Sequence, residues 1–141
     1  MQTKSILLSI FLAMTSMCMA QVRISTSDLN GTKWRDKHTP RGYDAYTAEK
    51  EIWYDEKGKS HPSPYYLTDT PVKSPERSAF DCSKVGKGTT GCYLVTMNEK
   101  MGTTYCYRIR YFDKEEGIME MKLITDRIIG WHNVIVYTLI K

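Results

Sequence analysis

Short segments rich in β-branched and aromatic residues recur along almost the whole chain, and this repetition constrains the fold more than any other feature. Turn residues separate the segments, as at 55–58, 98–102 and 113–117, where Gly at or near the end is typical of a hairpin connection. No window shows a sustained helical period, so the chain is predicted to be all-β with its strands in a meander, although short helical turns near 25–30 and 127–131 stay open. The predicted strands are 32–35, 45–54, 64–70, 78–81, 91–97, 103–112, 118–124 and 133–140.

Strands of this kind must protect their edges, and a chain of 141 residues has room for one domain. A sheet that closes on itself removes its edges and encloses one core or one small cavity, which favours a small antiparallel up-and-down β-barrel of about eight strands. A two-sheet β-sandwich would show the same alternation and is the alternative. Residues 134–140 are apolar on both faces, so we expect this last strand to be covered or to pair near the N-terminus and close the ring.

The first 20 residues have the pattern of a secretory signal peptide: Lys4 precedes an apolar run over 6–14, and the small residue Ala20 follows. We therefore expect a signal peptide over 1–20, one domain over 21–141 and a periplasmic or secreted location. Cys18 raises the alternative of a lipid anchor. The apolar run is shorter than the roughly 20 residues that span a bilayer, and no later stretch reaches that length, so no transmembrane segment is expected.

Three cysteines follow this leader, and an oxidising compartment favours their pairing. A hairpin centred on Glu99 would place Cys92 directly opposite Cys106, which predicts a disulfide between them. A bridge from Cys82 to Cys92 is the rival connectivity, and buried free thiols are the alternative to any bridge.

The same register assigns faces to the two strands of this hairpin. Tyr93 and Val95 would share one face with Tyr105 and Tyr107, while Arg108 would lie with the cysteines on the other. Tyrosine combines an apolar ring with a polar tip, so such a face is suited to line a cavity. The ligand-binding candidates are Trp53, Tyr93, Val95, Tyr105 and Tyr107. Because the chain has ten Tyr and three Trp, simple filling of the core is the alternative role for these residues.

The segment 29–34, Leu-Asn-Gly-Thr-Lys-Trp, opens the first strand and resembles the Gly-x-Trp start of lipocalins and related calycin barrels, with one extra residue before the Trp. This resemblance implies a lipocalin-like barrel in which Trp34 plugs the closed end. Segments 65–71, 80–81, 83–87 and 91–95 are similar to small secreted lipocalin-like proteins of unassigned function from Gram-negative bacteria. The resemblance thus implies a fold and a compartment.

Several patterns that can carry chemistry lack their structural context. Residues 86–91 match the letters GxGxxG, but a strand follows where a dinucleotide site needs a helix. The three histidines have no metal-ligand spacing, and Asp113, Glu115 and Glu116 are typical of a solvated turn. No nucleophile motif occurs, so we expect a protein that is not an enzyme and has no cofactor and no metal. A net charge of +4 gives no case for nucleic-acid binding.

Two functions remain. The first, which the resemblance implies, is a carrier or sensor that holds a small apolar ligand inside the barrel. The alternative is a protein-binding module, such as a periplasmic inhibitor of a lysozyme or protease, which would need a filled interior and a protruding loop. The Pro-rich stretch 57–77 is a candidate to cover the barrel mouth.

Overall fold

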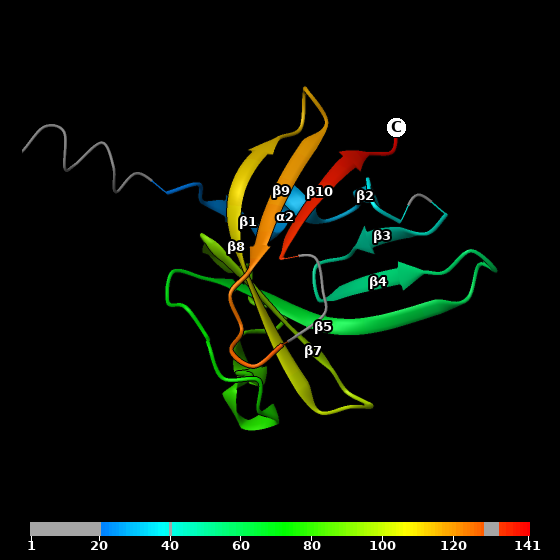
Figure 1. The fold of residues 1–141 in the computed structure, drawn as a ribbon. Helices are drawn as coiled ribbons and strands as arrows, with labels where there is room; N and C mark the ends of the chain where they lie inside the picture. The colour runs from blue at the N-terminus through cyan, green and yellow to red at the C-terminus, as the bar shows by residue number, and fades with distance from the viewer. Residues whose placement is uncertain (1–20, 40, 129–132) are drawn as a thin grey trace, which may run out of the picture.

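The computed structural model describes residues 21–39, 41–128 and 133–141, and these form a closed antiparallel barrel of eight strands (Figure 1). The strands follow one another around the ring in chain order, as predicted for a meander, and the fold is all-β as expected and consistent with a calycin-like barrel. The predicted signal peptide and Cys18 lie outside the described residues. The barrel strands are β2 (Lys33–Asp36), β3 (Tyr43–Tyr46), β4 (Lys50–Tyr54), β5 (Ser60–Thr68), β7 (Tyr93–Asn98), β8 (Thr103–Asp113), β9 (Ile118–Leu123) and β10 (Val134–Leu139).

The ring closes between the last strand and the first. Tyr137 pairs with Asp36, and Leu139 pairs with Trp34, in the antiparallel contact between β10 and β2. On its other side β10 pairs with β9 along five residues. The expectation that the apolar C-terminal strand pairs near the N-terminus is therefore confirmed, and both of its edges are hydrogen-bonded.

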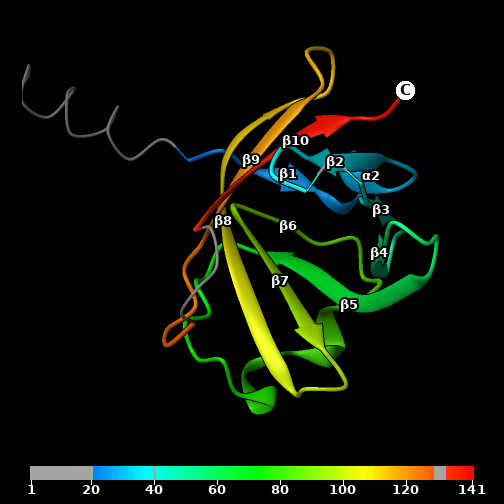
Figure 2. The same ribbon diagram turned by 45° about the vertical axis from the view of Figure 1, so that its right-hand side comes forward.

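A short N-terminal segment closes the end of the barrel at which β2 begins. It consists of β1 (Ile24–Ser25), which pairs with β6 (Thr90–Gly91), and the one-turn helix α2 (Thr26–Leu29), both of which are visible in Figure 2. Ile24 and Leu29 are buried in the same apolar cluster as Trp34. The Trp34 side chain is fully buried and its Nε1 donates a hydrogen bond to Thr32 Oγ1 at 2.8 Å. This end is called the closed end below.

The predicted strand 64–70 is longer in the structure and begins within the Pro-rich region. Pro62 and Pro64 both lie inside β5, opposite Ile52 and Lys50 of β4. The Tyr65 N–H donates to Glu49 O toward β4, whereas the Pro64 carbonyl accepts from Thr96 Oγ1 of β7. Proline lacks an N–H and cannot donate to a neighbouring strand. It is tolerated here because its nitrogen faces away from β4.

Two predicted strands were wrong in extent or type. The segment 45–54 is split into β3 and β4 by a turn in which Thr47 Oγ1 accepts hydrogen bonds from the N–H groups of Glu49 and Lys50. The segment 78–81 is not a strand, because a 3₁₀ helix, η1 (Arg77–Ala79), occupies it and a second, η2 (Cys82–Lys84), follows.

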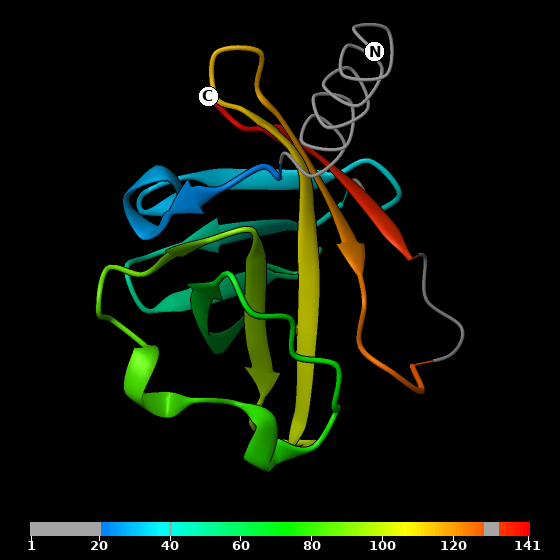
Figure 3. The ribbon, with the colours of Figure 1, turned by 90° about the vertical axis from the view of Figure 1, so that its left-hand side faces the viewer.

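The long connection from β5 to β7 packs on the outside of the barrel (Figure 3). Phe80, Val72 and Val85 of this connection join an apolar cluster with Tyr66, Val95, Met97 and Cys106. The expectation that the stretch 57–77 covers the mouth is therefore wrong, since 60–68 is a wall strand and the following residues lie against the outer face of β5, β7 and β8. No helix in the described ranges is both long and apolar enough to cross a membrane.

Replacing Trp34 should unfold the barrel far more readily than replacing the exposed Trp53. Trp34→Ala removes a fully buried ring from the closed end and should lower the free energy of unfolding by about 3–5 kcal/mol. Trp53 is 43% exposed, so Trp53→Ala should cost about 1 kcal/mol or less. Urea unfolding curves of the two variants measure both values, and equal losses would contradict the proposed role of Trp34 at the closed end.

Candidate functional site

The register of the β7–β8 hairpin decides which side chains face the interior. Val95 pairs with Cys106 and Thr96 pairs with Tyr105, so the strands are joined by the four residues between Asn98 and Thr103. Gly102 closes this turn with a positive φ of 65°, and its N–H donates to Asn98 O. The predicted turn centred on Glu99 was wrong, and the observed register differs from the predicted one by three positions. Because three is an odd number, the side chains of one strand that were expected on the inner face lie on the outer face.

The structure therefore brings only three of the five predicted ligand-binding residues to the inner wall. Tyr105 and Tyr107 of β8 face inward, and Trp53 of β4 lies on the same side because it pairs with the inward Asp44. Tyr93 and Val95 face the other way and pack in the outer cluster beneath the β5–β7 connection. Arg108 is exposed on the face opposite the two tyrosines, as predicted.

The predicted disulfide between Cys92 and Cys106 is absent, because Cys82, Cys92 and Cys106 are all free thiols. The shifted register places Val95 rather than Cys92 opposite Cys106. Cys92 Sγ instead donates to Gln21 Oε1 at 2.9 Å. Burial raises the pKa of the Cys106 thiol to about 11, which makes it a poor nucleophile.

Thiol counting tests this assignment on a chain that begins at Gln21 and is purified without reductant. In the folded protein the exposed Cys82 should react rapidly with a disulfide reagent such as dithionitrobenzoate, while the buried Cys92 and Cys106 should react slowly. After denaturation all three should react. Release of a single equivalent after denaturation would show a disulfide and contradict the structure.

The inner wall combines apolar and titratable side chains. Near the closed end an apolar set is almost fully buried and forms the floor of the interior: Trp34, Leu67, Leu94, Ile109, Met119 and Met121. Titratable side chains from several strands meet beside this floor, because Asp44 pairs directly with Trp34 across β2 and β3, and Tyr46 exchanges backbone hydrogen bonds with Gly31 and Thr32 at the closed end. Asp44 and Tyr46 come from β3, Glu51 from β4, Tyr65 from β5, Tyr107 from β8 and Tyr137 from β10.

Two carboxyl groups lie among these titratable side chains, because Asp44 and Glu51 occupy diagonal positions on one face of β3 and β4. Burial raises the pKa of Asp44 to about 6, and burial together with the charge of Asp44 raises the pKa of Glu51 well above its usual range. Asp44 and Glu51, called the acid pair below, therefore hold protons more tightly than free carboxyl groups do.

The tyrosines around this acid pair differ in how their hydroxyls are satisfied. Tyr65 donates to the Thr47 carbonyl at 2.7 Å and its ring meets the Tyr46 ring edge-on at 5.4 Å. Tyr46 is only 2% exposed, yet its hydroxyl has no hydrogen-bond partner. A buried hydroxyl without a partner costs free energy, so this atom is an unsatisfied polar group beside the acid pair.

Some of the inward side chains are only partly buried. Glu51, Tyr105 and Tyr107 each keep accessible surface although burial raises the pKa of Glu51 and of Tyr107. At the rim, Trp53 is stacked obliquely on His61 at 5.1 Å and lines a pocket of about 550 Å³. The described residues around that pocket are His38, Thr39, Arg41, Gly42, Trp53, Asp55, Glu56 and Lys57.

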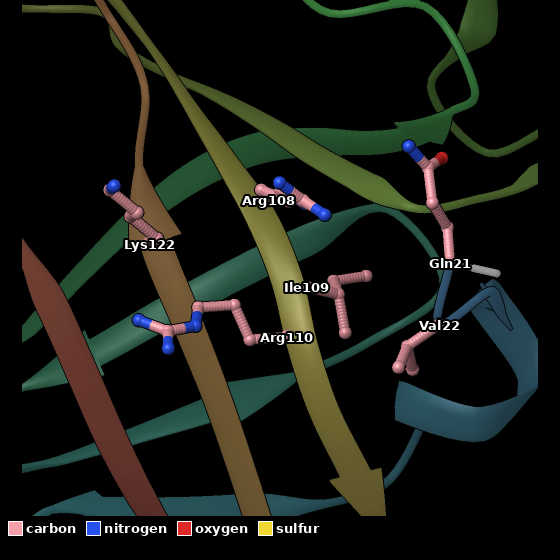
Figure 4. Close-up of a pocket in the computed structure, with 6 residues that line it drawn as sticks. All are labelled: Gln21, Val22, Arg108, Ile109, Arg110 and Lys122. Atoms are coloured by element: carbon pink, nitrogen blue, oxygen red, sulfur yellow. The ribbon is translucent and has the colours of Figure 1, made fainter. Parts of the chain in front are cut away.

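A second pocket, of about 400 Å³, lies on the outside of the barrel (Figure 4). Gln21 and Val22 of the N-terminal segment form one side, and Arg108, Arg110 and Lys122 of β8 and β9 bring positive charge to it. Arg110 lies 4.0 Å from Glu120, and its side chain, like that of Arg108, is exposed. These cations lie on the solvated outer face that the sequence predicted for the arginines.

Sequence reasoning did not find Asp44 and Glu51. Each looks like an ordinary surface acid, and the split between β3 and β4 that makes them neighbours falls inside one predicted strand. The available signal was the alternation of Asp44 with Tyr46 and of Glu51 with Trp53, which is typical of one strand face.

No family model, curated protein or solved structure matches this chain. Within the described part of the chain, no group of three or more His, Cys, Asp and Glu side chains is placed to hold a metal ion.

The acid pair should make the protein less stable as pH rises. Asp44 and Glu51 bind protons more tightly in the folded state, so their contribution to stability is complete below the unfolded pKa near 4. It is lost as pH rises, through about 6 for Asp44 and at higher pH for Glu51, whose pKa burial raises further. Between about pH 4 and pH 7 we expect the free energy of unfolding, measured with urea, to fall by on the order of 3 kcal/mol. The double variant Asp44→Asn, Glu51→Gln should not show this fall.

Asp69 provides a control of opposite sign. The guanidinium of Arg23 lowers its pKa, so the Asp69 contribution is present above pH 4 and is lost on acidification. Asp69→Asn should therefore leave the decline toward neutral pH in place. The free energy of unfolding of the wild type and of the double variant should therefore change differently between pH 4 and pH 7. An equal change in both proteins would contradict the raised pKa values of the acid pair.

Proposed function

We propose that this chain is an extracytoplasmic, non-enzymatic binding protein that holds a small ligand with an apolar body inside a lipocalin-like barrel. The observation that carries the proposal is the composition of the inner wall. The apolar side chains around Trp34 are fully packed, whereas Tyr105 and Tyr107 on the same wall are half-buried and the Trp53 ring at the rim is 43% exposed. Aromatic side chains with a few polar groups are typical linings of small-molecule sites.

The location is part of the same proposal. The sequence pattern of residues 1–20 supports export to the periplasm or the medium, with an anchor at Cys18 as the alternative. Free thiols at Cys92 and Cys106 are compatible with an oxidising compartment because both are buried. An exported carrier takes up its ligand outside the cytoplasm, so the test uses protein recovered from its own host.

Native mass spectrometry of that protein should show the polypeptide beginning at Gln21 with a bound small molecule. Tyr105→Ala removes part of the accessible lining and should lower the retained ligand about tenfold or more. Tyr111→Ala is the matched control, because Tyr111 lies on the same strand but is 41% exposed on the outer face. It should retain the ligand as the wild type does.

An empty interior in every preparation would contradict the proposal and would favour the alternative of a protein-binding module. One feature would then be the first surface to examine. The β7–β8 hairpin projects beyond the barrel wall with Met101 at its tip, 71% exposed, and Arg77 braces the turn through a hydrogen bond to the Glu99 carbonyl.

A further inference from the structure

The inner wall carries two carboxyl groups without a matching cation. Among the strand residues that the structure describes, no Lys or Arg alternates onto the wall that holds Asp44 and Glu51, because Arg35, Arg108 and Lys122 all fall on the opposite face. Neither acid forms an ion pair in the described chain. Buried acids are normally paired with cations or kept neutral, so a single positive charge would balance this pair once it is ionised.

Three oxygen acceptors are grouped around that position. Tyr46 pairs with Glu51 across β3 and β4, and Asp44 lies two residues before Tyr46 on the same face. The Tyr46 hydroxyl has no partner, and the acid pair lies within electrostatic range of it. A primary ammonium group has three N–H donors and no acceptor, which matches two carboxyl groups and one phenolic oxygen.

The surroundings also favour an organic cation over a hydrated inorganic ion. Aromatic rings attract cations through their faces, and Tyr46, Tyr65, Tyr107 and Tyr137 all lie near the acid pair. Metal ions prefer several carboxylate or carbonyl oxygens, and the described residues offer no cluster of that kind.

Building on the proposed function, we infer that the ligand is an amine: a primary ammonium group bound by Asp44, Glu51 and Tyr46, with an apolar body extending toward Tyr105 and Trp53. Binding needs the carboxyl groups ionised, so the pair releases protons as the ammonium enters. The other titratable groups that face the pair are Asp36 on β2, His61 and Tyr65 on β5, Tyr105 and Tyr107 on β8, and Tyr137 on β10. Burial raises the pKa of Tyr65, Tyr107 and Tyr137, which keeps these three neutral near pH 7.

Isothermal titration with two probes of matched shape tests the inference on the chain from Gln21 to Lys141. At about pH 8, 2-phenylethylamine is still protonated, whereas 2-phenylethanol is neutral at any pH. The amine should bind at least about tenfold more tightly than the alcohol, and its binding enthalpy should depend on the buffer because protons are released. The affinity for the amine should fall as the pH is lowered toward 5.

Variants separate binding from stability. Glu51→Gln should weaken amine binding about tenfold and leave alcohol binding unchanged, while Glu115→Gln, in the exposed β8–β9 turn, should match the wild type. Tyr46→Phe should also weaken amine binding, yet its unfolding midpoint should stay equal or rise because a buried hydroxyl without a partner is removed. A purely structural tyrosine would not weaken amine binding in this way.

The possible failures are distinguishable. Equal affinity for amine and alcohol, or unchanged amine binding in Glu51→Gln, would overturn the amine inference and leave the proposed carrier function standing. Binding of the neutral dye N-phenylnaphthylamine without binding of the amine would likewise overturn the amine inference and leave the carrier function standing. Absence of binding by both probes and by the dye would overturn the amine inference and the proposed function together.

Discussion

The antiparallel contact between β10 and β2 is the interaction on which the rest of the molecule depends. It converts a meander of eight strands into a ring, and only a ring has an inside and an outside. Once the ring is closed, the alternation of side chains along each strand decides which of them meet at the centre of the barrel. Leu139 pairs with Trp34 in this contact, so the pair that closes the wall also joins the last strand to the residue at the closed end.

A second constraint arises from what the closed wall encloses. The floor beside Trp34 consists of apolar side chains, and their burial stabilises the fold in the usual way. Asp44 and Glu51 lie beside this floor, since Asp44 pairs with Trp34, and these acids must keep protons or find a cation to be tolerated there. A wall of the same shape with apolar residues at both positions would be at least as stable, so the acids fit a functional requirement better than a structural one.

The sequence pattern predicted most of the architecture but not the arrangement of the site. Composition and turn residues located the wall strands, and the apolar strand 134–140 correctly indicated closure. Register was harder, because it depends on the conformation of the turn before Gly102, and a slip of three residues moved Tyr93 and Val95 to the outer face. Asp44 and Glu51 were missed because their contact depends on a turn at Thr47 inside what looked like one continuous strand.

The apolar floor and the acid pair together determine how a ligand would be oriented. Residues of the floor are too tightly packed to admit a molecule, since Trp34, Leu94 and Met119 have no exposed surface. The polar end of a ligand would therefore stop at the acid pair, and its apolar body would extend back past Tyr105 toward Trp53. This orientation explains why aromatic residues lie at the rim while the charged groups lie deeper. Removing an ammonium group from water is costly, and two carboxyl groups and several ring faces at the same depth offset that cost.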